Sequence, residues 1–174
     1  MKPFFLFSLI LVILFSASCT KKEVYPDIPV ISFSKVELRD TTETVGESGN
    51  KAKLCRINFS IIDGDGNIGI KKGEDTTSHD FFAEIFQKKN GEIQKIELVA
   101  PYKFRLPYIE PEGQNKLLKA DIMIDFIFNY YNNSLLYDSV MYKFYINDRD
   151  GNISNTVETP VFSLKSEGVF YELK

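Results

Sequence analysis

Apolar and polar residues alternate with a period of two along several short stretches of this 174-residue chain. In the clearest stretch, residues 51–62, Cys55, Ile57, Phe59 and Ile61 alternate with polar residues. This pattern is typical of β-strands with one buried face. No stretch has a convincing helical period. The pattern predicts strands over residues 30–38, 51–62, 81–88, 92–99, 118–128, 139–147 and 155–164.

About seven short strands separated by turn signals predict an all-β fold, an antiparallel immunoglobulin-like β-sandwich. Asn90 and Gly91 form the strongest hairpin signal, between two predicted strands. Residues 100–115 contain three prolines, so we expect an irregular excursion there. A closed barrel is an alternative that the periodicity leaves open.

The N-terminus has the three parts of a secretory signal peptide. Lys2 precedes an apolar run over residues 4–15, and small residues follow at 16–18. The run is too short to span a membrane, which takes about 20 apolar residues. We therefore expect a cleaved signal peptide over 1–18 and a polar tether over 19–29. The sandwich domain is expected over 30–166, with a C-terminal tail over 167–174 whose apolar residues suggest that it docks on the domain.

Cys19 follows the small residues directly. The segment resembles the bacterial lipoprotein signal, Leu-small-small-Cys, with Ser16 in the first place. The resemblance implies cleavage before Cys19 and acylation of this residue, because its thiolate is the nucleophile that takes the lipid. Ordinary cleavage with an unmodified Cys19 is the alternative. Two or three acyl chains would hold the protein firmly on a membrane. Thr20, in place of an Asp, fits export to the outer membrane, on either its periplasmic or its surface face.

The charge and the content of cysteine and histidine argue against nucleic-acid binding and against catalysis. The formal net charge is −3, so no basic excess is present to neutralise phosphates, and nucleic-acid binding is not expected. Cys55 is the only other cysteine and is predicted to be a buried thiol. The single histidine, His79, lies in a polar stretch. No catalytic constellation is found, so we do not expect an enzyme.

One motif occurs twice, at residues 63–68 (DGDGNI) and 148–153 (DRDGNI). Asp63 and Asp148 each come one step after the last inward residue of a predicted strand. Each carboxylate is therefore expected to accept bonds from N–H groups two residues on, in an Asx turn. Gly66 and Gly151 supply a positive φ in this interpretation. The isoleucines that end the two motifs would turn back onto the core.

The alternative interpretation is a Ca²⁺ site. A true EF-hand is excluded, because Ile68 and Ile153 stand where its sharp turn needs glycine. If the preceding strands are B and F of an immunoglobulin-like sandwich, however, both motifs lie at one end of it. Their carboxylates would then attract a cation or raise each other's pKa. The candidate ligands are Asp63, Asp65, Asn67, Glu74, Asp148, Asp150 and Asn152.

Two groups of tyrosines lie outside the inward strand positions. Loop tyrosines suit the recognition of glycans or proteins. The alternative is that they cover the edge of the sandwich. The residues are Tyr102, Tyr108, Tyr130, Tyr131 and Tyr137.

With the lipoprotein signal, DGDGNIG and DRDGNISNTVETP together, the chain resembles a group of small lipoproteins common in Bacteroidetes. The resemblance extends over most of the mature chain, through Pro101-Tyr102 and Pro111-Glu112-Gly113. It implies a membrane-anchored cell-envelope lipoprotein and carries no catalytic residues over. We therefore expect a non-catalytic binding or structural module for an envelope protein or glycan. A Ca²⁺-dependent or glycan-binding adhesive module is the alternative.

Overall fold

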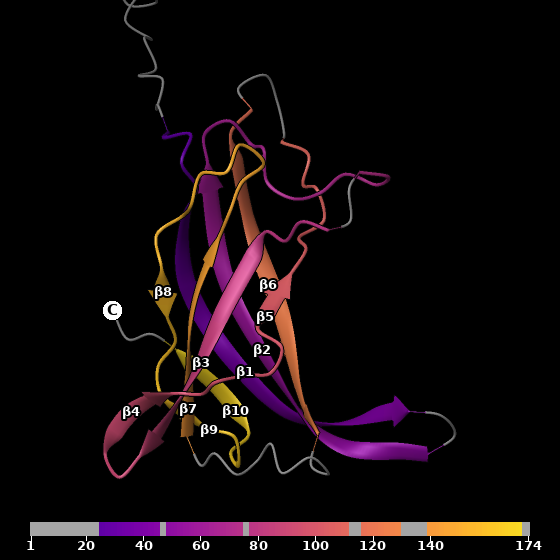
Figure 1. The fold of residues 1–174 in the computed structure, drawn as a ribbon, viewed down its shortest axis with the longest axis vertical. Coiled ribbons are helices and arrows are strands. Elements are labelled where there is room, and N and C mark those ends of the chain that lie inside the picture. The colour runs from indigo at the N-terminus through magenta and orange to yellow at the C-terminus, as the bar shows by residue number, and fades with distance from the viewer. Residues whose placement is uncertain (1–24, 46–47, 75–76, 112–115, 130–138, 172–174) are drawn as a thin grey trace, which may run out of the picture.

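The computed structural model describes residues 25–45, 48–74, 77–111, 116–129 and 139–171. This part of the chain forms ten strands in two antiparallel sheets (Figure 1), so the predicted all-β sandwich is confirmed. It holds no helix long and apolar enough to cross a membrane. The strands are β1 (Val30–Val45), β2 (Ser48–Asp63), β3 (Phe81–Lys89), β4 (Glu92–Lys95), β5 (Tyr102–Phe104), β6 (Leu118–Asn129), β7 (Ser139–Ile146), β8 (Val157–Glu158), β9 (Phe162–Ser163) and β10 (Gly168–Tyr171).

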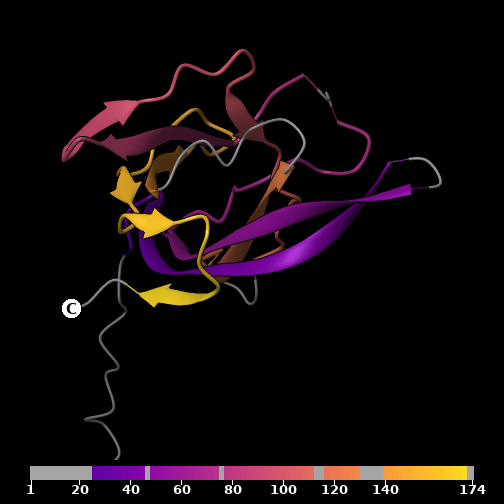
Figure 2. The same cartoon turned by 90° about the horizontal axis from the view of Figure 1, so that it is seen from below.

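The strand order is that of an immunoglobulin-like sandwich. One sheet has the order β10-β1-β2-β6, and the other has the order β4-β3-β7-β8, with β5 also on β3 and β9 also on β7. The chain therefore changes sheets between β2 and β3, between β5 and β6, between β6 and β7, and between β9 and β10. The changes from β2 to β3 and from β6 to β7 correspond to those between strands B and C and between E and F of that fold. Seen from below, the two sheets lie one over the other (Figure 2).

The core lies between the sheets and is rich in aromatic side chains. Phe59 of β2 packs against Phe81 of β3 and Phe144 of β7, with ring centroids 5.8 and 5.2 Å apart. All three rings are buried. Cys55, one inward position before Ile57, is a fully buried free thiol, as predicted, and burial raises its pKa. The alternation read from the sequence is thus the alternation of core and solvent faces.

Strands β1 and β2 are longer than predicted. The register shifts between Phe33 and Lys35, where the pairing with β2 is irregular but continues. Pairing of β1 with β2 runs on to Val45 and Ser48, whereas pairing of β2 with β6 begins only at Ala52. A two-stranded hairpin arm therefore projects beyond the sheet, at the lower right of Figure 1.

Four further regions depart from the sequence prediction. The strand predicted over 92–99 ends at Lys95, and β5 pairs with β3 inside the stretch expected to be irregular. Residues 155–164 form two short strands, β8 and β9, separated by Thr159 and Pro160. Thr159 bonds both backbone groups of Tyr142, and a proline has no N–H for a sheet, so a single continuous strand is interrupted there. The expected C-terminal tail contributes β10, which pairs with β1, so the sheet continues beyond residue 166.

Candidate functional site

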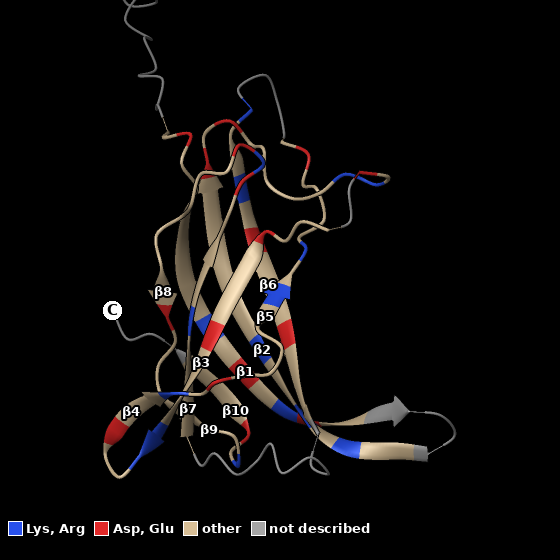
Figure 3. Ribbon diagram, in the orientation of Figure 1, with Lys and Arg blue, Asp and Glu red and all other residues tan. Residues whose placement is uncertain are grey.

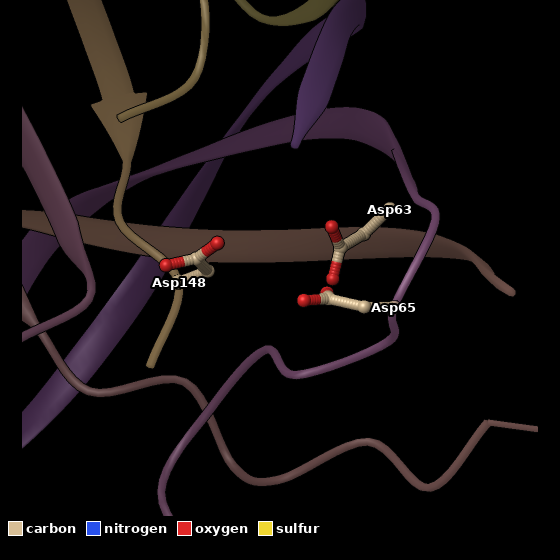
Figure 4. A group of neighbouring side chains, drawn as sticks. All are labelled: Asp63, Asp65 and Asp148. Carbon is tan, nitrogen blue, oxygen red and sulfur yellow. The ribbon is translucent and has the colours of Figure 1, made fainter. Parts of the chain in front are cut away.

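The two Asp-Gly motifs meet at one end of the sandwich, as strand assignment from the sequence predicted. Strand β2 ends at Asp63 and β7 ends at Ile146, and both run toward the same end. Acidic residues gather in the loops there, above β2 and β7 (Figure 3). Single carboxylate oxygens of Asp63, Asp65 and Asp148 all lie within 4.8 Å of one another (Figure 4). We call these three residues the carboxylate cluster.

The first loop, residues 63–68, is packed into the molecule. Asp63 is fully buried, and its Oδ2 accepts a bond from Asn67 N (3.0 Å). Gly66 has a φ of 64°, and a Cβ there would overlap the carbonyl oxygen of Lys116. Ile68 is fully buried in the core, as predicted. The carboxylate of Asp63 thus reaches four residues along the chain, where an Asx turn would reach two.

The second loop, residues 148–153, is a self-contained turn. Asp148 Oδ1 accepts bonds from Asp150 N (2.9 Å) and Asn152 N (2.7 Å), and its Oδ2 accepts a bond from Asn152 Nδ2 (2.7 Å). The bond to Asp150 is the predicted Asx turn. The predicted return of Ile153 onto the core is wrong, because its side chain is 59% exposed. The turn is complete through its own polar groups, so it does not need this isoleucine as an anchor.

Several hydrogen bonds join the second loop to the first loop and to the residues that follow it. Arg149 N donates to the carbonyl oxygen of Asn67 (3.2 Å). Asn67 Nδ2 donates to Asp65 Oδ2 (3.0 Å) within its own loop and to Asp150 Oδ2 (2.9 Å) across the gap. Arg149 donates two bonds to the Glu74 carboxylate, at 2.6 and 2.7 Å. These contacts fix the position of the second loop relative to the first.

We call the end of the sandwich that holds the two loops the pole. Burial and mutual repulsion shift the pKa values of the carboxylates at this pole. Loss of hydration raises the pKa of Asp63 to about 7, with smaller upward effects from Asp65 and Asp148 and a downward one from the Asn67 N–H. The pKa of Glu74 is lowered to about 2, chiefly by its hydrogen bonds from Arg149. The carboxylates at this pole therefore differ in what surrounds them: Glu74 has a cationic partner, whereas Asp63 has anionic neighbours.

Three side-chain oxygens of the first loop are buried and have no hydrogen-bond donor. They are Asp63 Oδ1, Asp65 Oδ1 and Asn67 Oδ1. No lysine or arginine in the described ranges forms an ion pair with the carboxylate cluster. A buried acceptor without a donor costs about 1–3 kcal/mol. Chemically, these oxygens can share a proton or ligate a hard cation.

The other predicted ligands have different positions. Glu74 lies outside the carboxylate cluster, because Arg149 and the Lys71 N–H take its oxygens. Asp150 accepts from Asn67, and Asn152 is used within its own turn. Asp150 and Asn152 thus hold Asn67 and Asp148 in place.

Sequence reasoning missed two residues of this pole, Arg149 and Asp80. Asp80 is buried, and its Oδ2 accepts a bond from Leu106 N (3.2 Å). Burial raises its pKa. Its position immediately before the inward-facing Phe81 was the available signal. Asp80, His79, Glu74, Asp148 and Arg149 line a hollow of about 480 Å³ beside the cluster.

The tyrosines do not form one surface in the described part of the chain. Tyr102 packs edge-on against Phe126, with ring centroids 4.9 Å apart, and so covers the core. The Tyr108 ring contacts Lys71 and Arg149, whose charged groups lie 4.6 and 5.7 Å from its centroid. The remaining candidates, Tyr130, Tyr131, Tyr137 and Cys19, lie outside the described residues.

No protein-family model matches this chain, and no significant match was found among curated proteins or solved structures.

Proposed function

We propose that the protein is a cell-envelope lipoprotein, anchored by acyl chains on Cys19, whose sandwich is a non-catalytic binding or support module. The proposal is supported chiefly by the order in which the leader, Cys19 and the strands follow one another along the chain. A signal-like leader ends at Cys19, and the strands of the described sandwich lie within residues 30–171. Every described strand thus begins after the leader, so cleavage before Cys19 would remove none of them.

With an anchor at Cys19, the fold would favour one orientation of the domain on the membrane. Pro26 accepts a bond from Gly64 N (2.9 Å), so the chain enters the domain beside the first loop. Six residue steps from Cys19 to Tyr25 reach about 20 Å at most, at about 3.3–3.6 Å per residue. The pole with the two loops would thus face the membrane. The hairpin arm lies at the opposite end (Figure 1) and would be presented to a partner.

A non-catalytic role is supported by how the reactive groups are used. Cys55 is fully buried and its pKa is raised, which suits a structural thiol and not a nucleophile. The Asp148 carboxylate accepts three bonds within its turn, and Glu74 is paired with Arg149. These acids have structural partners already.

The anchor is tested by replacing each cysteine in turn. We expect the Cys19→Ala chain to leave the membrane fraction and to lose the mass of the acyl chains. Cys55→Ala is the matched control and should keep both the lipid and the membrane attachment. Intact mass spectrometry and membrane fractionation give the readouts. Retention of Cys19→Ala in the bilayer as tightly as the unaltered chain would refute the proposal.

The second candidate is a Ca²⁺-dependent or glycan-binding adhesive module. Its cation part is favoured by the carboxylate cluster, which we take up below. Its glycan part has less support, because the described tyrosines contact the protein's own residues. Binding to a glycan array that EGTA abolishes would favour this candidate. A binding signal that is unaffected by EGTA and lost only when Cys19 is removed would count against it.

A further inference from the structure

We propose that Asp63, Asp65 and Asp148, together with the side-chain oxygen of Asn67, bind one Ca²⁺ ion. This site goes beyond membrane anchoring and does not depend on the lipid. It joins the ends of β2 and β7, the two strands that bring the loops to one pole.

The donor set selects the class of metal. All four side chains offer oxygen, and hard cations such as Ca²⁺ and Mg²⁺ prefer oxygen ligands. Ligands on opposite sides of a Ca²⁺ ion lie about 5 Å apart, from bond lengths of about 2.3–2.6 Å. The carboxylate oxygens lie within 4.8 Å of one another, which fits that span. Around Mg²⁺ the span is only about 4.2 Å, and its near-ideal octahedron is harder to build from irregular loops.

Buried oxygens without donors supply an independent indication of a ligand. Asp63 is 0% exposed, and its Oδ1 has no hydrogen-bond partner. Figure 4 shows this carboxylate pointing at that of Asp65, with Asp148 facing both from the second loop. Asp65 Oδ1 and Asn67 Oδ1 are also buried without partners. A cation in their midst would satisfy all three oxygens at once.

Nearby positive charges are directed elsewhere. Arg149 is the basic residue within the second loop, but its guanidinium binds Glu74 and the Gly69 carbonyl. The Lys71 ammonium lies over the Tyr108 ring. A proton held between Asp63 and Asp65 is another way to balance the charge without a metal. The two explanations differ in whether added Ca²⁺ changes the protein.

The ligands are held before the ion arrives. Three donors, Asp150 N, Asn152 N and Asn152 Nδ2, fix the Asp148 carboxylate. The Asn67 amide group bonds Asp65 and Asp150, which leaves its oxygen free for the ion. Such supporting bonds orient metal ligands in proteins generally.

The test uses the full-length chain in detergent after dialysis against EGTA. Calorimetric titration with CaCl₂ should show one site, with a Kd of about 10⁻⁴–10⁻³ M, as in extracellular calcium modules. Thermal denaturation should show a higher Tm with Ca²⁺ and a smaller rise with equal Mg²⁺. Asp63→Asn should weaken Ca²⁺ binding at least tenfold. Asp121→Asn, an exposed aspartate on β6, is the matched control and should bind as the unaltered chain does.

Absence of both heat and a Tm change at about 10 mM Ca²⁺, well above the expected Kd, would overturn the proposal. Unchanged binding by Asp63→Asn would overturn it as well. If circular dichroism shows that Asp63→Asn does not fold, the half-buried Asp65→Asn replaces it, with the same expected loss. Membrane retention in the Cys19 experiment is unaffected by either result, so the two proposals fail separately.

Discussion

The two loops have nearly the same sequence but different surroundings. In the first, Asp63 and Ile68 are fully buried, and Gly66 lies against Lys116 and Pro111 of the same chain. In the second, Ile153 is exposed, and the Gly151 position is open to solvent. One loop is part of the core's end, whereas the other rests on its surface.

This difference shows what a short motif determines and what it leaves to its context. Both glycines adopt a positive φ, 64° at Gly66 and 87° at Gly151, so the bend itself is local. The hydrogen-bond partners of the carboxylates, by contrast, depend on the surroundings of each loop. Asp148 has its donors within its own turn, whereas Asp63 keeps one oxygen without a donor. Local sequence makes the turn, and tertiary packing makes the candidate site.

Truncating the two isoleucines should give the largest contrast. Ile68→Ala should cost about 2–5 kcal/mol, because it opens a cavity in the core. Ile153→Ala should change stability by no more than about 0.5 kcal/mol, as exposed substitutions do. Urea denaturation of both chains measures the difference. Equal losses would show that the loops are packed alike.

The two glycines should give the next contrast. Gly66→Ala combines an unfavourable backbone conformation with a clash against the Lys116 carbonyl, for which we expect about 2–4 kcal/mol. Gly151→Ala meets no neighbouring atom, so only the conformational cost of about 1–2 kcal/mol remains. Urea midpoints give both values. A larger loss at Gly151 would contradict the described packing.

A double-mutant cycle tests the side-chain hydrogen bond between the loops, from Asn67 to Asp150. Asn67→Ala and Asp150→Ala should show a coupling energy of about 1 kcal/mol, because each removes the same hydrogen bond. The cycle is measured from urea unfolding in EGTA, so that no bound cation contributes. Additive losses would mean that the loops are not joined through this contact.

The smallest expected effect concerns acid. The pKa of Glu74 is lowered to about 2 in the folded protein, below its ordinary value of 4.5. The unfolded chain therefore takes up this proton first, and the stability that the carboxylate provides is lost as the pH falls from about 4.5 toward 2. Glu74→Gln should reduce this acid dependence slightly, since the pair is exposed. Urea midpoints at pH 7 and pH 3 compare the two chains, and identical acid losses would count against the pairing with Arg149.

The sequence predicted the parts of the fold in which one strand face is buried. On β6, Phe126 and Phe128 are buried, whereas Met123 and Ile127 are exposed. This is the alternation read from the chain. Residues 42–45 and 48–50 escaped prediction because the hairpin arm leaves the sheet there, so no alternation is required of them. Strand β10 was missed because its pairing depends on the free edge of β1, which local sequence does not encode.

For the candidate site, the assignment of the preceding strands as B and F of an immunoglobulin-like sandwich was enough to place Asp63 and Asp148 at one pole. It did not show which carboxylates would be satisfied. Glu74 was a reasonable ligand by spacing, but its partner, Arg149, comes from a loop 75 residues away. Pairings between irregular loops depend on the path of the whole chain and have no periodic signal.

The path of β1 has a mechanical consequence for an anchored protein. This strand starts at the pole where Pro26 contacts Gly64, and it pairs with β2 from Val30 to Val45. Tension between a membrane at that pole and a load at the hairpin arm would act parallel to the strands. The β1–β2 ladder would then be loaded in shear, with its hydrogen bonds strained together and not broken one after another.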